Sequence, residues 1–140
     1  MVNYPDTQAN NPTATSNAKD VQVKSFRVAR TNTTASVMAV IPQDATILNI
    51  ALSGITASDA ATTATVSVGT TSTANEWINA FDVKTTSTGA GQNLPPLVAG
   101  LGNLNGLPAG TDVQVYAKYA ETGTASTTGG PWYINIYYVR

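Results

Sequence analysis

Two segments near the C-terminal end of the chain have a residue pattern that repeats every two positions. This period-2 pattern constrains the fold more than any other feature. One segment runs from Val113 to Tyr119 and the other from Trp132 to Arg140. The second is rich in aromatic and β-branched residues, and period-2 alternation of this kind predicts half-buried β-strands. The connector from Glu121 to Pro131 has three glycines and no large apolar residue. It is therefore predicted to be an exposed loop between neighbouring antiparallel strands.

Short apolar segments separated by Gly, Pro and Asn predict further strands along the chain. These strands are expected at Val21 to Thr31, Ser36 to Ile41, Thr46 to Leu52 and Ala64 to Val68, with a short edge strand around Leu94 to Ala99. The segment from Thr46 to Leu52 is apolar on both faces, with Ile47 opposite Leu48, Ile50 and Leu52. This pattern is typical of a central strand.

The segment from Glu76 to Lys84 has a different spacing of apolar residues. Trp77, Ile78 and Phe81 fit one or two helical turns better than a strand. The sequence therefore favours a short helix or an irregular crossing at this point.

Seven or eight short strands without a long amphipathic helix predict an all-β protein, and specifically a two-sheet antiparallel β-sandwich of the jelly-roll type. Its long crossovers between sheets are expected at Ala57 to Thr63 and Thr85 to Gly110. Residues 1–20 contain Pro5 and Pro12 and no periodicity, so they are predicted to form an extended N-terminal arm. Residues 21–140 are predicted to form a single domain.

The chain has no cysteine and no histidine, which excludes disulfides, thiolate or imidazole metal sites and His-dependent catalytic triads. Six carboxylates could in principle supply a glycosidase pair, but isolated acidic residues in turns are usually caps or solvated. These are Asp44, Asp59, Glu76, Asp82, Asp112 and Glu121. We expect no enzyme activity and no cofactor.

The charge and hydropathy patterns also exclude two classes of partner. The net charge is −1 and no basic cluster exists, so nucleic acid is not an expected partner. No apolar window approaches 18 residues, so no membrane span is expected. Charged residues make up only 11% of the chain, against about 25% in a typical soluble domain. An uncharged polar surface of this kind suits packing against another protein, although many secreted β-sandwiches share it.

The aromatic residues of the last predicted strand occupy both of its faces. Trp132 and Tyr138 share one face, and Tyr133 and Tyr137 share the other. One face must be core, because two exposed aromatic faces would leave a large apolar patch in water. The face with Tyr133 and Tyr137, with Tyr116 beside it, is expected to be a protein contact, a carbohydrate-stacking platform or a surface covered by a loop. The residues expected to contact other proteins are Val2, Tyr4, Tyr116, Tyr133 and Tyr137.

Three stretches carry a resemblance to a known family. They are TATVSVG at 63–69, NAFDVK at 79–84 and, above all, YAETGTASTTGGPWYINIYYVR at 119–140. In these stretches the chain resembles the capsid cement, or decoration, proteins of tailed phages, and most of all that of a Bordetella phage. The resemblance covers the chain from about Val21 to its end.

The resemblance implies a jelly-roll protein made in the cytoplasm of a bacterial host and bound to the outer surface of an HK97-like capsid. It implies homodimers that bridge neighbouring subunits of the major capsid protein and stiffen the shell without chemistry. The absence of cysteine agrees with synthesis in a reducing cytoplasm. The alternative is a carbohydrate- or receptor-binding β-sandwich of a phage tail or surface protein that uses Tyr133 and Tyr137.

Overall fold

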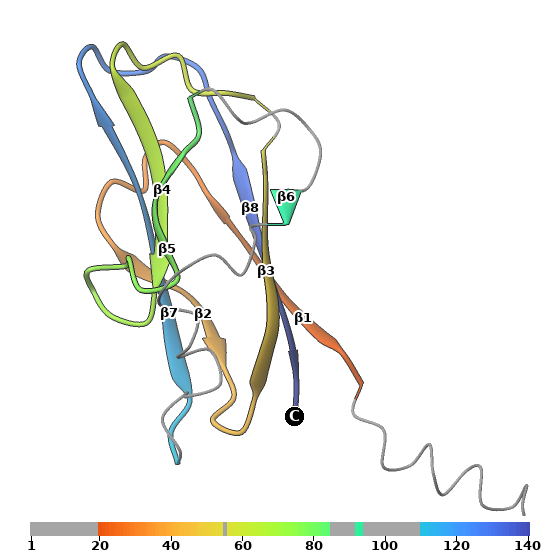
Figure 1. Cartoon of the computed structure of the whole chain (residues 1–140). Coiled ribbons are helices and arrows are strands. Elements are labelled where there is room, and N and C mark those ends of the chain that lie inside the picture. The colour runs from red at the N-terminus through yellow and green to blue at the C-terminus, as the bar shows by residue number, and fades with distance from the viewer. Residues whose placement is uncertain (1–19, 55, 85–91, 94–109) are drawn as a thin grey trace, which may run out of the picture.

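The computed structural model describes residues 20–54, 56–84, 92–93 and 110–140, and these residues form two four-stranded antiparallel sheets (Figure 1). The strands are β1 (Gln22–Val28), β2 (Ser36–Ile41), β3 (Thr46–Gly54), β4 (Thr63–Gly69), β5 (Ile78–Asp82), β6 (Gln92–Asn93), β7 (Val113–Thr122) and β8 (Trp132–Val139). The predicted all-β sandwich is confirmed. The predicted arm lies outside the described residues except for Asp20, as does the segment Leu94 to Ala99.

The strand order is β1-β8-β3-β6 in one sheet and β2-β7-β4-β5 in the other. The first strand therefore pairs with the last, the second with the seventh, the third with the sixth and the fourth with the fifth. A long antiparallel hairpin rolled up on itself gives this order, which is consistent with the expected jelly roll. The predicted crossover at Ala57 to Thr63 connects β3 of one sheet with β4 of the other. Most of the second predicted crossover, Thr85 to Gly110, lies outside the described residues.

The prediction that β7 and β8 are neighbours in one sheet is wrong. The connector from Glu121 to Pro131 crosses from one sheet to the other, because β8 pairs with β1 and β3 while β7 pairs with β2 and β4. Both strands have one continuous apolar face. They pack these faces against each other across the core instead of sharing hydrogen bonds along an edge.

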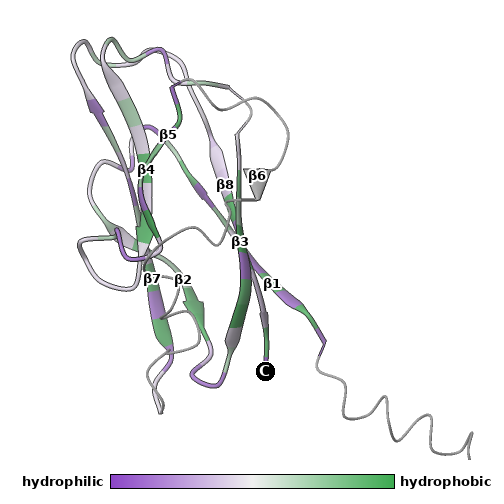
Figure 2. Ribbon diagram, in the orientation of Figure 1, coloured by the Kyte–Doolittle hydropathy of each residue, from purple (hydrophilic) through white to green (hydrophobic). Residues whose placement is uncertain are grey.

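The core lies between the two sheets, and hydrophobic and hydrophilic residues alternate along the strands that enclose it (Figure 2). Tyr119 of β7 and Trp132 of β8 are both fully buried, and their rings stack with centroids 5.1 Å apart and planes within 9°. Ile134 and Ile136 are also fully buried. The face of β8 that carries Trp132 is therefore the core face, as the alternation predicted.

A β-bulge in β3 changes which of its residues face the core. Ile47 pairs with Tyr138 and Asn49 pairs with Tyr137, so Leu48 is an extra residue in the ladder. Leu48 is 52% exposed, whereas Ile47 and Ile50 are buried together. The predicted placement of Ile47 opposite Ile50 is wrong, because the inserted residue reverses the alternation between them.

A second bulge explains why the sequence of β5 looked helical. Two residues of β5, Asn79 and Ala80, lie opposite the single residue Ser67 of β4. Ala80 takes the left-handed conformation with φ of 52°, and its N–H donates to Ser67 Oγ at 3.0 Å. The extra residue gives Ile78 and Phe81 a spacing of three. The predicted short helix at Glu76 to Lys84 is therefore wrong, and the segment is a bulged strand.

Candidate protein-binding surface

The outer face of the sheet formed by β1, β8 and β3 carries both tyrosines that the sequence singled out on β8. Tyr133 and Tyr137 alternate with the buried residues of β8, so their side chains point away from the core. Their register partners on β1 are Arg27 and Val23, respectively. Directly paired residues of antiparallel strands lie on the same face. We call this surface, made by Val23, Arg27, Tyr133 and Tyr137 and bordered by Leu48, the tyrosine face.

The tyrosine face gathers much of the exposed apolar surface of the described residues. Six large apolar side chains are exposed in those ranges, and four of them lie on or beside this face. They are Val21, Val23, Leu48 and Tyr133. Exposed apolar groups that cluster in this way mark interaction surfaces more often than chance.

The tyrosine face carries one charged residue, and it is cationic. Lys24 and Arg27 are the charged residues of β1, β3 and β8. Of these only Arg27 lies on the tyrosine face, because Lys24 pairs with the buried Ile136. Between the tyrosines lies a polar strip in which Ser25 Oγ donates to Asn135 Oδ1 at 2.6 Å. The arrangement offers aromatic contact area with one cation, Arg27, at its β1 border. It fits a partner surface that is apolar at its centre and carries carboxylates at its edge.

Not all of the predicted contact residues lie together. Tyr116 is on the outer face of β7, which belongs to the other sheet, and its hydroxyl donates to Gln114 Oε1 at 2.9 Å. Its side chain therefore points away from Tyr133 and Tyr137. Val2 and Tyr4 lie outside the described residues. Sequence reasoning did not include Leu48, because nothing in an apolar run marks the bulge that exposes it.

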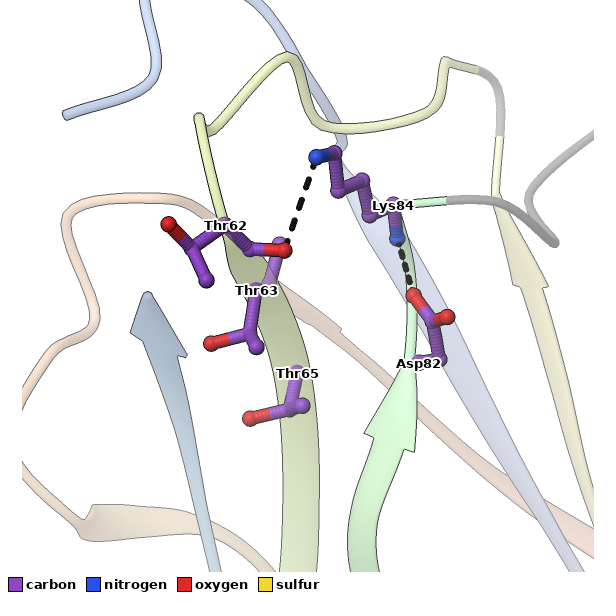
Figure 3. A pocket seen from close by; sticks show the side chains of 6 residues that line it. Thr62, Thr63, Thr65, Asp82 and Lys84 are labelled. Carbon is purple, nitrogen blue, oxygen red and sulfur yellow. Dashed lines mark hydrogen bonds between the residues drawn. The ribbon is translucent and has the colours of Figure 1, made fainter. Parts of the chain in front are cut away.

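A pocket of about 280 Å³ opens beside β4 and β5 (Figure 3). Its polar groups are held by structural hydrogen bonds. Lys84 Nζ donates to the Ala61 carbonyl at 2.8 Å, the Lys84 N–H donates to Asp82 Oδ1 at 2.7 Å, and Thr63 Oγ1 lies 2.6 Å from Thr122 Oγ1. These contacts stabilise the β4 and β5 ends. The pocket is therefore a weaker candidate for a binding site than the tyrosine face.

The crossover loop between β7 and β8 is anchored inside the sandwich by a buried tyrosine. The Tyr119 hydroxyl donates to Glu121 Oε2 at 2.6 Å and lies 2.7 Å from Ser58 Oγ. The Ser126 N–H also donates to Glu121 Oε2, at 3.1 Å, and the Arg30 guanidinium donates to the Ser126 carbonyl. Hydrogen bonds from Ser126 and Tyr119 lower the pKa of Glu121, which keeps it ionised as an acceptor.

Asp59 fixes the outer part of the same loop. Its Oδ1 accepts the N–H groups of Thr127 and Thr128, each at 2.8 Å, and its Oδ2 accepts the Thr127 hydroxyl at 2.7 Å. The hydrogen bonds from Thr127 and Thr128 lower the pKa of Asp59 to about 2. The carboxylate therefore joins two loops that are far apart in the sequence.

We expect Asp59→Asn to reduce the acid sensitivity of the fold. A carboxylate whose pKa is lowered by folding contributes stability above its unfolded pKa of about 3.9, and loses it as the pH falls towards the folded value. Melting temperatures of both proteins between neutral pH and about pH 2 test this. The variant should be less stable at neutral pH, and its deficit should shrink below about pH 4. A deficit that stays constant with pH would contradict the assignment.

The remaining carboxylates named as a possible hydrolytic pair also make structural contacts. Partial burial raises the pKa of Glu76, but hydrogen bonds from Thr71, Thr73 and nearby backbone groups outweigh this and hold it at about 2. Asp44 pairs with Arg140 at 3.1 Å on the surface, and Asp112 accepts the Gln43 N–H. Among the described residues, no cluster of metal-ligating side chains forms, and no helix could cross a membrane.

Comparisons with known proteins find two solved structures that contain chains of similar fold. No family model and no curated protein matches the chain. A chain in the structure of the cyanophage Pam1 capsid asymmetric unit matches with a TM-score of 0.58 and 21% identity, covering 88% of this chain and 86% of that one. A chain in the acidic stable capsid structure of Helicobacter pylori bacteriophage KHP30 matches with a TM-score of 0.53 and 13% identity, covering 88% and 94%.

The chain shares its fold with chains of two phage capsids. At these identities the matches show the fold alone. Because nearly the whole of each pair is aligned, the matched chains are similar in length to this one. The more specific resemblance to a Bordetella phage protein stays a prediction.

Proposed function

We propose that this protein is a structural component of a virion that binds the outside of an assembled HK97-like phage capsid and cements neighbouring major capsid subunits. The proposal is carried by the similarity of nearly the whole chain to chains of two phage capsid structures. The cement role and the outer location come from the resemblance seen in the sequence, above all in residues 119–140.

The chemistry of the molecule agrees with a binding role rather than a catalytic one. The carboxylates that could have formed a hydrolytic pair are engaged in holding loops or in a surface ion pair. The tyrosine face, in contrast, leaves apolar area exposed that a partner would cover. Rigid aromatic rings at the centre of an interface commonly carry most of its binding energy.

The stabilisation of a shell by a bound cement protein follows from mass action. A protein that binds only the assembled shell stabilises it by RT ln(1 + [L]/Kd), which is about 2.7 kcal/mol per site at a hundredfold excess over Kd. Contact with two neighbouring subunits at once makes this energy oppose their separation. Summed over many sites, a moderate affinity is sufficient.

The test uses empty shells of the phage that encodes this protein, stripped of it, and measures the occupancy of added variants by sedimentation. We expect Tyr133→Ala and Tyr137→Ala to weaken shell binding by about 30-fold each, the effect of losing an interface hot spot of about 2 kcal/mol. Tyr116→Ala is the matched control, because Tyr116 also lies on the outer face of a central strand but in the other sheet. Its affinity should change less than about threefold.

Equal affinities of the Tyr133→Ala and Tyr116→Ala variants would rule out the tyrosine face as the contact. Absence of any shell binding by the wild-type protein would overturn the cement role itself.

The second candidate is a carbohydrate- or receptor-binding module. It is favoured by the exposed ring of Tyr133 next to the hydrogen-bonding strip of Ser25 and Asn135, a combination that suits a sugar ring. A glycan array probed with the wild-type protein and the Tyr133→Ala variant separates the two. Binding to a glycan that Tyr133→Ala abolishes, together with no affinity for shells, would favour this candidate.

A further inference from the structure

We propose that the open edge of β1 pairs with β1 of a second copy, in antiparallel register centred on Ser25, so that one sheet runs continuously through both molecules. The proposal concerns self-association and does not depend on the capsid. It starts from the position of β1 at one edge of the sheet β1-β8-β3-β6.

β1 is the one edge among the described strands that is both long and regular. It pairs with β8 over all seven of its residues without a register shift. The edges at β2 and β5 are blunted, because bulges interrupt both strands, and only two residues are described at the remaining edge, β6. Bulges and short strands are the usual means by which proteins protect sheet edges from pairing.

β1 also extends beyond the body of the sandwich at its N-terminal end, where it projects to the lower right in Figure 1. The residues from Gln22 to Ser25 are exposed on both faces. A second strand could therefore approach this edge without displacing any of the described residues. Strand addition to such an edge supplies main-chain hydrogen bonds along its whole length.

The charges on β1 exclude two of the possible registers. When a two-fold axis perpendicular to the sheet relates the two strands, directly paired residues lie on the same face of the sheet. The axis must therefore lie midway between one residue of β1 and the same residue of the second copy. Centring on Lys24 or on Arg27 places like charges directly opposite each other. Centring on Ser25 places Arg27 opposite Val23 and Lys24 opposite Phe26 of the second copy.

The Ser25 register has two further advantages. It pairs Gln22 with Val28, so all of β1 is used. The half-exposed Val23 is then covered by the aliphatic part of Arg27. The observations therefore favour a second copy, rather than an unrelated strand, as the occupant of this edge.

The chain contains no cysteine, so a single introduced thiol reports the register directly. Directly opposed residues of antiparallel strands have Cα atoms about 4.5–5.5 Å apart, within the range of a disulfide. Under mild oxidation, the full-length Ser25→Cys variant should form a covalent dimer. Ser36→Cys is the matched control, because Ser36 is an exposed serine at the start of the bulged edge strand β2. It should stay largely uncrosslinked.

A pair of charge variants tests the same register without cross-linking. Val23→Arg would face Arg27 of the second copy and should weaken dimerisation by about tenfold, whereas Val23→Asp would face the same Arg27 and should keep or strengthen it. Sedimentation equilibrium in the absence of shells measures both. Sedimentation of the wild-type protein as a monomer at high micromolar concentration would overturn the proposal. So would equal cross-linking of the two cysteine variants, or equal effects of the two Val23 variants.

Discussion

Trp132→Ala is expected to destabilise the domain by about 3–5 kcal/mol, the usual cost of truncating a large buried aromatic residue. Trp132 is fully buried and stacks on Tyr119, so its loss leaves a cavity and removes the ring contact between the two sheets. Single domains are commonly stable by only about 5–15 kcal/mol. Urea denaturation followed by circular dichroism should therefore show a midpoint shifted far towards zero.

The matched control is the next residue of the same strand. Tyr133 lies on the opposite face of β8 and is 37% exposed, so Tyr133→Ala should change the unfolding free energy by no more than about 1 kcal/mol. Similar destabilisation by the two substitutions would contradict the assignment of faces. An unchanged midpoint for Trp132→Ala would show that the core lies elsewhere.

The sequence predicted the features that depend on local alternation. In β8 the period of two is unbroken, so the burial of Trp132 and the outward direction of Tyr133 could both be inferred. The same holds for β1, where Phe26 and Val28 face inward and Arg27 faces outward. Short strands separated by turns were sufficient to indicate a two-sheet sandwich.

Features that depend on inserted residues or on pairing partners could not be inferred in this way. The bulges at Leu48 and Ala80 each reverse the alternation, and an extra residue has no signature in an apolar run. The partner of a strand is also a tertiary choice, which is why β7 and β8 were placed in one sheet. That error put Tyr116 beside Tyr133 when they lie on opposite sheets.

The candidate site was predicted in part for the same reasons. Its two tyrosines belong to a regular strand and could be identified, whereas Val23 joins them only through the pairing of β1 with β8. The anchoring of the crossover loop could not be foreseen, because Asp59 and Thr127 are separated by 68 residues. Only the fold brings that carboxylate to its donors.

Tyr119→Phe is expected to cost about 1–3 kcal/mol, although it removes a single oxygen atom from the core. The hydroxyl lies 2.7 Å from Ser58 Oγ and donates to Glu121 Oε2 at 2.6 Å. Without it, the buried Ser58 hydroxyl and the partly exposed Glu121 carboxylate each lose a partner. Urea denaturation at neutral pH measures the loss, and a destabilisation below about 0.5 kcal/mol would contradict a structural role for this bond.

The pH dependence of this loss identifies Glu121 as the acceptor. Hydrogen bonds from Ser126 and Tyr119 lower the folded pKa of Glu121, so its contribution is present above the unfolded value of about 4.3 and is lost as the pH falls through the folded value. Tyr119→Phe removes one of these bonds and moves the folded pKa back towards its ordinary value. The stability difference between wild type and Tyr119→Phe should therefore be largest near neutral pH and shrink below about pH 4. In a Glu121→Gln background the same comparison should lose this pH dependence, and its persistence there would assign the effect to another carboxylate.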